Sequence, residues 1–187
     1  MSQRLQSTSN IWGTGASSGI GEALTKALIE QGHHLVVTGR RQEALDELQQ
    51  FGGESVTTAR ADTTSREDLA AIADTLESNG DLNMAVLNAG TCEYLDISEY
   101  DSEVIEKNLT TNVVGTARSL DIALPALRRT VQQGRPATLV IVSSSAWWFP
   151  FTRAEGYGAS KAALAYLAQS LRADLAREGI EVFLVSP

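Results

Sequence analysis

The stretch Thr14-Gly15-Ala16-Ser17-Ser18-Gly19-Ile20-Gly21 lies between a short apolar segment, 11–14, and a stretch whose apolar residues recur at helical spacing. Because Gly15, Gly19 and Gly21 carry no side chains, the backbone can turn tightly here and approach a ligand closely. The turn leads into a helix, whose first amide groups attract anions. A tight strand-to-helix turn without a ligand is the alternative interpretation, and the context favours a site for the pyrophosphate of a dinucleotide.

The alternation of apolar runs and helical patterns continues along the rest of the chain. We predict further strands at 35–38, 55–61, 84–87, 138–142 and 182–185, and helices at 42–50, 65–78, 102–132 and 157–177. Pro125 is expected to interrupt the long central helix. Parallel strands need crossover connections, which these helices supply. The predicted fold class is α/β: a doubly wound parallel sheet (Rossmann fold) in one domain, 11–187, after a polar leader, 1–10.

Composition narrows the classes of function. The 187 residues are 43% hydrophobic and 20% charged, which is typical of a soluble globular domain, and the net charge of -8 disfavours nucleic acid and anionic membranes as partners. Cys92 is the only cysteine, so neither an intramolecular disulfide nor a thiolate metal cluster is expected, and no apolar run is long enough to span a membrane. We therefore expect a cytoplasmic protein without a metal. The neighbouring His33 and His34 are expected in an exposed turn.

The stretch Tyr157-Gly158-Ala159-Ser160-Lys161 opens a predicted helix, shortly after a run of three serines, 143–145, that ends a predicted strand. Residues four apart lie on one face of a helix, so the Lys161 ammonium can approach the Tyr157 phenol. A positive charge there favours the phenolate and makes the tyrosine usable as a proton-transfer group. A serine hydroxyl at the strand end can stabilise negative charge on a substrate oxygen.

The end of the second predicted strand indicates which dinucleotide the chain prefers. An NAD-selective Rossmann domain presents an acidic residue there to the ribose 2′-hydroxyl, whereas this chain has Gly39 followed by Arg40 and Arg41. A guanidinium group suits a 2′-phosphate because its planar fork donates two hydrogen bonds and neutralises charge. Cations at the start of a helix oppose the helix dipole, which makes them unusual without an anionic partner. We therefore expect NADP (NADPH), with NAD less favoured.

These motifs, in this order, resemble the classical short-chain dehydrogenase/reductase family. The resemblance begins with the T-G-x-x-x-G-x-G spacing of the glycine turn and includes the N-A-G element Asn88-Ala89-Gly90, the N-x-x-G element that begins at Asn112, and the Tyr157 and Lys161 pair. It spans nearly the whole chain. A turn at 88–90 and a structural hydrogen-bonding role for Asn112 are the alternatives that the residues alone leave open.

The resemblance implies a set of site residues. The catalytic residues would be Ser144, Tyr157, Lys161 and Asn112, with Ser145 as the alternative serine. Tyr157 would exchange the proton, Ser144 would polarise the carbonyl, and Asn112 would help to hold a water linked to Lys161. Asp62 would contact the adenine, although a turn or cap aspartate is equally consistent with the sequence. The residues expected to bind the cofactor are Gly15, Ser17, Ser18, Gly19, Ile20, Gly21, Arg40, Arg41, Asp62, Asn88, Ala89, Gly90, Tyr157 and Lys161.

The implied activity is hydride transfer between NADPH and a carbonyl or secondary alcohol substrate. The alternatives are an inactive dinucleotide-binding sensor or interaction module, and an inactive fragment of a reductase. Relative to the family pattern the chain is C-terminally truncated, because it stops at Pro187, before the expected final strand and substrate lid. We also expect a homo-oligomer. The aromatic run 147–151, together with Cys92 and Tyr94, is expected either to line the mouth of a pocket or to serve in packing.

Overall fold

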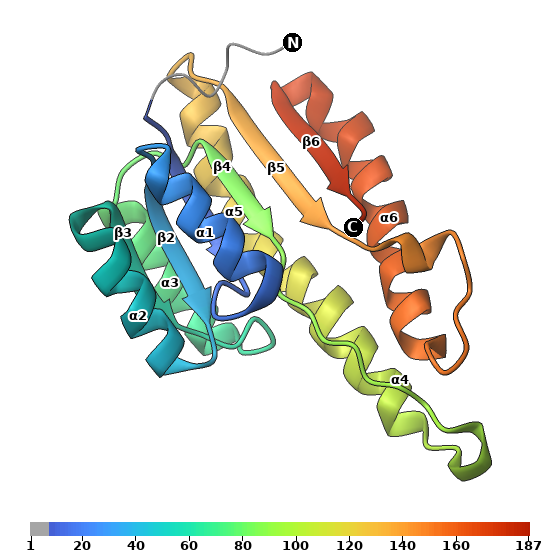
Figure 1. The fold of residues 1–187 in the computed structure, drawn as a ribbon. Coiled ribbons are helices and arrows are strands. Elements are labelled where there is room, and N and C mark those ends of the chain that lie inside the picture. Colours follow the sequence, from blue (N-terminus) through green and yellow to red (C-terminus); the bar gives the residue numbers. More distant parts are fainter. Residues whose placement is uncertain (1–7) are drawn as a thin grey trace.

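The computed structural model describes residues 8–187 as six parallel strands in one sheet with helices on both faces (Figure 1). The strands are β1 (Asn10–Thr14), β2 (His34–Gly39), β3 (Val56–Arg60), β4 (Met84–Leu87), β5 (Ala137–Val142) and β6 (Ile180–Val185). The main helices are α1 (Gly19–Glu30), α2 (Gln42–Gly52), α3 (Arg66–Ser78), α4 (Ser102–Leu109), α5 (Gly115–Gln132) and α6 (Glu155–Leu175). The predicted doubly wound parallel sheet is confirmed.

The strand order is β3-β2-β1-β4-β5-β6, so the direction of progression reverses between β1 and β4. In a doubly wound sheet, ligands bind at the carboxyl ends of the strands where this reversal opens a crevice. The glycine turn follows β1 and the Asn-Ala-Gly turn follows β4, so both stand on opposite sides of that crevice. Of the predicted leader 1–10, residues 1–7 lie outside the described residues, and Asn10 already belongs to β1.

Each face of the sheet has its own apolar core. On one face Trp12, fully buried, packs with Leu69 of α3, Leu127 of α5 and Leu164 of α6. On the other face Leu28 of α1 and the buried leucines of α2 cover the sheet. Strands that are buried on both faces require near-continuous apolar sequences. This requirement explains why β4 and β5 read as uninterrupted apolar runs.

Two local predictions were wrong. Pro125 does not interrupt α5, because it lies on the exposed face, where water can satisfy the carbonyl that loses its partner. The irregularity lies instead at a π-helical turn, Thr110–Val114, between α4 and α5. His33 is buried rather than exposed, and its Nδ1 accepts a hydrogen bond from the Ser9 amide at 3.3 Å. Only His34 of the pair is exposed.

The described part of the sheet ends at β6, which pairs with β5 along its whole length. Phe183 and Val185 of this strand are about half exposed, at 50% and 44%. None of the helices in residues 8–187 has both the length and the apolar character needed to cross a membrane.

Substitution of Gly13 in β1 tests whether there is free space beside this strand. A methyl group added to this glycine would meet no atom within 4 Å. We predict that Gly13→Ala raises the free energy of unfolding by about 0.5–1 kcal/mol, because alanine loses less backbone entropy than glycine on folding into a strand. Urea denaturation followed by circular dichroism measures this change.

Gly21→Ala is the matched control, because a Cβ at this position would lie 2.2 Å from the carbonyl oxygen of Gly15. It should destabilise the protein. A loss of stability in Gly13→Ala would show that β1 cannot accept the methyl group.

Candidate active site

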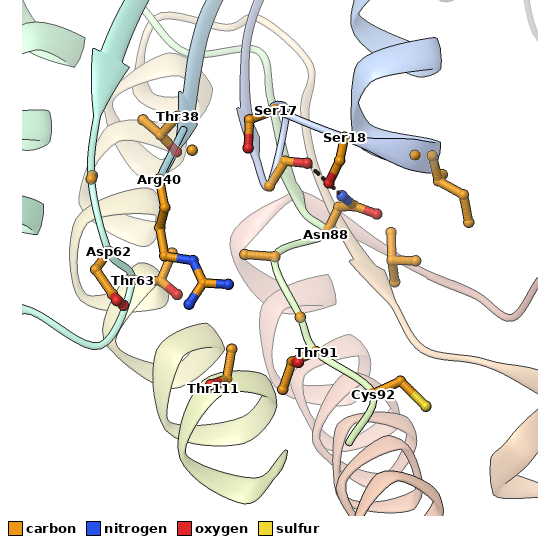
Figure 2. A pocket seen from close by; sticks show the side chains of 18 of the residues that line it. Ser17, Ser18, Thr38, Arg40, Asp62, Thr63, Asn88, Thr91, Cys92 and Thr111 are labelled. Carbon is orange, nitrogen blue, oxygen red and sulfur yellow. Dashed lines mark hydrogen bonds between the residues drawn. The ribbon is translucent and has the colours of Figure 1, made fainter. Parts of the chain in front are cut away.

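A cavity of about 320 Å³ runs along the carboxyl ends of β1, β2, β4 and β5 (Figure 2). It extends from Arg40 and Asp62 at one end, past the glycine turn, to Tyr157 and Lys161 at the other. Of the predicted site residues, those that line it are Gly15, Ser17, Ser18, Gly19, Ile20, Arg40, Asp62, Asn88, Ala89, Gly90, Tyr157 and Lys161. Gly21, Arg41, Asn112 and Ser144 do not line it.

The glycines of the first turn are required by close contacts and by backbone conformation. Gly15 has φ of 67°, and a Cβ there would lie 2.8 Å from the Cα of Ala89. Gly19 also has a positive φ, of 55°. The Ser18 side chain makes no capping hydrogen bond to α1, so the first-turn amides of this helix remain available to an anion. The turn therefore fits a pyrophosphate group.

The turn after β4 is tied directly to the turn after β1. The Thr14 hydroxyl oxygen accepts hydrogen bonds from the amides of Asn88 and Ala89, both at 3.0 Å. The Asn88 side chain in turn donates to the carbonyl oxygens of Thr14 and Gly15, at 3.2 and 3.4 Å. Asn88 thus fixes the two sides of the crevice relative to each other, in addition to lining the cavity.

The end of the cavity next to β2 has no space for a side chain on Gly39, the last residue of the strand. A Cβ on Gly39 would lie 2.7 Å from the Ser17 hydroxyl oxygen. Arg40 extends into the cavity (Figure 2). Arg41 lies outside the lining of the cavity and donates a hydrogen bond to the Ser17 carbonyl oxygen. Arg41 therefore braces the glycine turn.

Asp62 is a turn aspartate that also lines the cavity. Its carboxylate accepts hydrogen bonds from the amide and hydroxyl of Thr64, at 2.8 and 2.7 Å, as a turn aspartate does. It also lines the cavity near Arg40. Burial raises the pKa of Asp62, but the hydrogen bonds from Thr64 and the charge of Arg40 outweigh this effect and hold the pKa below its ordinary value.

Tyr157 and Lys161 lie together at the far end of the cavity. The Lys161 ammonium is 5.6 Å from the centre of the Tyr157 ring, one helical turn away on α6. Lys161 is only 5% exposed, and its Nζ donates a hydrogen bond to the Val142 carbonyl oxygen at 3.1 Å. Burial lowers the pKa of this lysine to about 8. The Lys161 ammonium therefore loses its proton at a lower pH than an exposed lysine does.

The serines at the end of β5 divide into different environments. Ser143 lines the cavity, but its hydroxyl donates to the Lys161 carbonyl oxygen at 2.8 Å, so it serves to hold α6 against β5. Ser144 is partly buried beside the cavity lining, and its hydroxyl oxygen accepts a hydrogen bond from the Ala146 amide at 3.2 Å. This bond leaves the hydroxyl proton of Ser144 free to be donated.

Asn112 lies on the π-helical turn and is fully buried beneath the cavity. Its side chain accepts from the Thr91 amide at 2.7 Å and donates to the Thr91 carbonyl oxygen at 2.9 Å. It also donates to the Ser160 hydroxyl at 2.8 Å. A Cβ on Gly90 would lie 3.0 Å from the Asn112 side-chain oxygen and 3.5 Å from the Lys161 Nζ. Asn112 therefore has the structural hydrogen-bonding role that was one of the two interpretations of the sequence.

Comparison with known proteins decides the family. The sequence profile of the family described as short chain dehydrogenase matches residues 10–187. The chain belongs to this short-chain dehydrogenase family. Membership places it among oxidoreductases that act on CH–OH or C=O groups with a nicotinamide dinucleotide.

Individual relatives agree with this assignment. An uncharacterized oxidoreductase of Staphylococcus epidermidis is 34% identical over 176 residues, which cover 93% of this chain and 74% of that protein. A short-chain dehydrogenase from Streptomyces avermitilis superposes with a TM-score of 0.88 at 31% identity, over 97% of this chain and 66% of its own. The RhlG/NADP active-site complex of Pseudomonas aeruginosa gives a TM-score of 0.89 at 28% identity, over 100% of this chain and 75% of its own. The chain thus spans about two thirds to three quarters of these relatives.

Some residues of this short-chain dehydrogenase site were missed from the sequence. Thr38, Ala61, Thr63, Thr91, Thr111, Val142 and Ser143 also line the cavity. Several of them directly follow or end a strand, and the rule that carboxyl ends of parallel strands face the ligand could have found them. Thr111 lies on the π-helical turn, which the sequence pattern does not indicate. Within residues 8–187 no three His, Cys, Asp or Glu side chains gather as metal ligands would.

The buried ammonium predicts a pH-dependent stability. Folded Lys161 releases its proton at about pH 8, whereas the unfolded chain holds it up to the ordinary value of 10.5, so the unfolded state binds more protons in between. Wild-type stability therefore rises with pH over this interval. Relative to wild type, Lys161→Met should be more stable at neutral pH, and the difference in unfolding free energy should shrink by roughly 2 kcal/mol between about pH 7 and about pH 9.5.

Guanidinium denaturation at a series of pH values measures this difference. The matched control is Lys107→Met, because Lys107 is exposed on α4 and should show a difference that does not change with pH. A constant difference for Lys161→Met as well would contradict the burial of the charged amine.

Proposed function

We propose that this short-chain dehydrogenase reduces a carbonyl compound with NADPH. The observation that carries the proposal is the Tyr157 and Lys161 pair at one end of a cavity whose other end is formed by the glycine turn, Arg40 and Asp62. The reactive pair and the anion-binding turn are joined by one continuous space of about 320 Å³. This arrangement suits a long dinucleotide whose reactive ring meets a proton donor.

Each residue of the proposed catalytic set has its own role in the reduction. A bound nicotinamide dinucleotide supplies the hydride. Tyr157 gives its phenolic proton to the oxygen of the reduced carbonyl, and the adjacent Lys161 ammonium stabilises the negative charge left on the phenol. Ser144 donates a hydrogen bond to the carbonyl oxygen and so favours the charge that develops there. Asn112 holds the Thr91 backbone. As the resemblance to the family implies, it would also help to hold a water that links Lys161 to solvent.

The cofactor is NADP rather than NAD. The close approach of Ser17 to Gly39 leaves no room for an acidic side chain at position 39. Arg40, which lines the cavity, offers a 2′-phosphate a guanidinium group. Three neighbours in structure carry the phosphorylated cofactor: the RhlG/NADP complex, a serine dehydrogenase complexed with NADP+, and an actinorhodin polyketide ketoreductase with NADPH. The glycine turn holds the pyrophosphate, through Gly15, Ser17, Ser18, Gly19, Ile20 and Gly21. The turn after β4 borders the nicotinamide ribose, through Asn88, Ala89 and Gly90.

A dinucleotide-binding sensor is the competing function, and the presence of Ser144, Tyr157 and Lys161 together argues against it. A module that only binds the dinucleotide needs no proton donor such as Tyr157. We propose further that the partner is a small carbonyl or alcohol substrate and that the protein works in the cytoplasm. The protein assembles as a homo-oligomer, and each copy consists of the single domain 11–187.

Replacement of the phenol should separate catalysis from binding. We predict that Tyr157→Phe lowers the rate of NADPH oxidation with aldehydes or ketones by about 10²–10⁴-fold, the usual contribution of a positioned proton donor, while NADPH still binds. Absorbance measures the turnover and NADPH fluorescence measures the binding. Tyr166→Phe, on the exposed side of the same helix, is the matched control and should keep full activity. Binding of NADPH by the wild type without Tyr157-dependent turnover would favour the sensor.

Reversal of charge at the β2 end tests the cofactor. We expect Arg40→Asp to weaken NADPH binding about tenfold or more and to change NADH binding little, because only the 2′-phosphate loses a cation and gains a repelling carboxylate. Titration calorimetry with both dinucleotides measures the two dissociation constants. Arg177→Asp, at a residue exposed beyond the end of α6, controls for the change in net charge. Equal losses for NADPH and NADH would overturn the choice of NADP.

A further inference from the structure

The first turn of α6, which carries Tyr157, is a poorly stabilised helix end. Its N-cap residue is Ala154, whose side chain cannot accept a hydrogen bond from the amides of the turn. Tyr157 is flanked by Gly156 and Gly158, and glycine is a poor helix former because it loses more backbone entropy than other residues on folding. The local sequence therefore gives this turn little resistance to fraying, and fraying would displace the proposed proton donor.

The two glycines differ in what their surroundings require. A Cβ on Gly156 would lie 2.9 Å from the Cα of Ile105 on α4, so a side chain here would push the two helices apart. A Cβ on Gly158 would meet the Ala146 carbonyl oxygen at 3.4 Å, which is an ordinary contact. Close packing against α4 thus explains Gly156, whereas the turn has space for a better helix former at position 158.

A buried serine in the following turn ties this helix end to another helix. Ser160 is 0% exposed, and its hydroxyl donates a hydrogen bond to the Tyr157 carbonyl oxygen at 2.7 Å. The same hydroxyl oxygen accepts a hydrogen bond from the Asn112 side-chain nitrogen at 2.8 Å. Asn112 lies on the π-helical turn between α4 and α5. Two hydrogen bonds in series therefore join the backbone of Tyr157 to a neighbouring part of the fold.

The direction of these two hydrogen bonds follows from the chemistry of the partners. The Thr91 amide can only donate and the Thr91 carbonyl can only accept, so together they identify the oxygen and the nitrogen of the Asn112 amide. The nitrogen has a second N–H, which it donates to Ser160. The single hydroxyl proton of Ser160 is then left for the Tyr157 carbonyl oxygen. Bonds in such a series strengthen one another in the protein interior, so loss of the hydroxyl weakens the whole link.

A buried serine that bonds to its own helix is common and does not by itself indicate a function. Ser119 of α5 is such a residue: it is 1% exposed, and its hydroxyl donates to the Gly115 carbonyl oxygen at 2.9 Å. Within residues 8–187, the Ser119 side chain has no hydrogen bond to a second helix, whereas that of Ser160 has the one from Asn112. The bond from Asn112 is therefore the observation that indicates a positioning role.

The Ser160 link acts on Tyr157 rather than on Lys161, because the lysine is held separately. Its carbonyl oxygen accepts a hydrogen bond from the Ser143 hydroxyl at 2.8 Å, and its Nζ donates to the Val142 carbonyl oxygen at 3.1 Å. Both bonds come from the end of β5 and the residue after it. Loss of the Ser160 hydroxyl should therefore loosen the phenol while the buried ammonium stays in place.

We propose that Ser160 is a positioning residue for the reduction: with Asn112 it anchors the first turn of α6 and so aims the Tyr157 phenol at the substrate. Ser160 does not line the cavity, so it acts through the backbone of Tyr157 and not by contact with substrate or dinucleotide. This inference rests on the proposed carbonyl reduction for the use of the phenol, but not for the anchoring of the turn.

Hydrogen exchange tests the anchoring without turnover. The amides of Gly158 and Lys161 take part in the first helical hydrogen bonds of α6. In Ser160→Ala with NADPH bound, both amides should exchange about tenfold faster, because a buried hydrogen bond that resists local opening is lost. Amides further along α6, such as that of Ala168, should keep their protection. Unchanged exchange at Gly158 and Lys161 would overturn the anchoring.

Kinetics test whether the anchoring aims the phenol. Ser160→Ala should lower kcat for an aryl ketone, expressed per NADPH-binding site, about tenfold or more, since a displacement of about 1 Å between reacting groups can slow a reaction roughly a hundredfold. The KM for the ketone and the NADPH dissociation constant should each change less than about twofold, because Ser160 contacts neither ligand. An unchanged kcat, or equal losses in kcat and NADPH affinity, would overturn the positioning role.

Ser119→Ala is the matched control, because it removes a hydroxyl that is similarly buried and bonds to its own helix. It should leave kcat and the exchange of the Gly158 and Lys161 amides unchanged. If Ser119→Ala speeds this exchange as much as Ser160→Ala does, the effect is a general loss of stability and the link from Asn112 has no specific role.

A better helix former in the same turn should restore what Ser160→Ala loses. Gly158→Ala adds a methyl group that the structure accommodates, and it raises the helix propensity of the turn. We expect the double variant Gly158→Ala/Ser160→Ala to recover most of the amide protection and of the kcat, because the hydroxyl acts by ordering the turn. Failure to recover either quantity would overturn this account of how Ser160 acts.

Ser160→Cys keeps nearly the same side-chain size and replaces the hydroxyl with a weak donor, so it serves if Ser160→Ala does not fold. It should change exchange and kcat in the same directions. A wild-type protein that binds NADPH but reduces no ketone would instead contradict the proposed function, and the exchange of the Gly158 and Lys161 amides would still decide whether Ser160 anchors the turn.

Discussion

The burial of the Lys161 ammonium beside Tyr157 is the constraint on which the rest of the site depends. The amine is 5% exposed and meets one backbone carbonyl, so the fold bears a desolvation penalty that lowers its pKa to about 8. Two neighbouring residues help to keep it there. Ser143 holds the lysine backbone to β5, and Gly90 leaves space for the amine next to Asn112. A buried cation with so few partners is understandable in a site where it acts on a phenol and a bound dinucleotide.

The parallel sheet brings that pair to the anion-binding turn. Because β1 and β4 are neighbours and point the same way, the glycine turn and the Asn-Ala-Gly turn meet at one edge, where Thr14 and Asn88 bind them together. The segment after the Asn-Ala-Gly turn leaves the sheet. Its backbone amides at Thr91 and Glu93 donate hydrogen bonds to the side chains of Asn112 and Asn108, in the region from α4 to α5, rather than to another strand. The same helical region therefore contacts Ser160, next to Lys161, on one side and the segment after the Asn-Ala-Gly turn on the other.

The fold and the centre of the site were predictable from the sequence because they depend on local rules. Strand periodicity, a glycine-rich turn between a strand and a helix, and the four-residue spacing of Tyr157 and Lys161 each predict an arrangement from neighbouring residues alone. The remainder depends on tertiary packing. Nothing near Arg41 in the sequence indicates that it braces the glycine turn, and a run of three serines does not reveal that Ser143 binds the Lys161 carbonyl. Asn108 reads as an ordinary polar residue until its partner Glu93, distant along the chain, is placed beside it.

Transfer of a labelled hydride is the most direct test of the central claim that Tyr157 and Lys161 face a nicotinamide ring and a carbonyl group. NADPH carrying deuterium on the transferable position at C4 would be incubated with the protein and an aryl ketone, and the alcohol product analysed by mass spectrometry. The account predicts one deuterium on the carbinol carbon, of a single stereochemistry. Alcohol without deuterium, or no labelled alcohol although NADPH is bound, would contradict it.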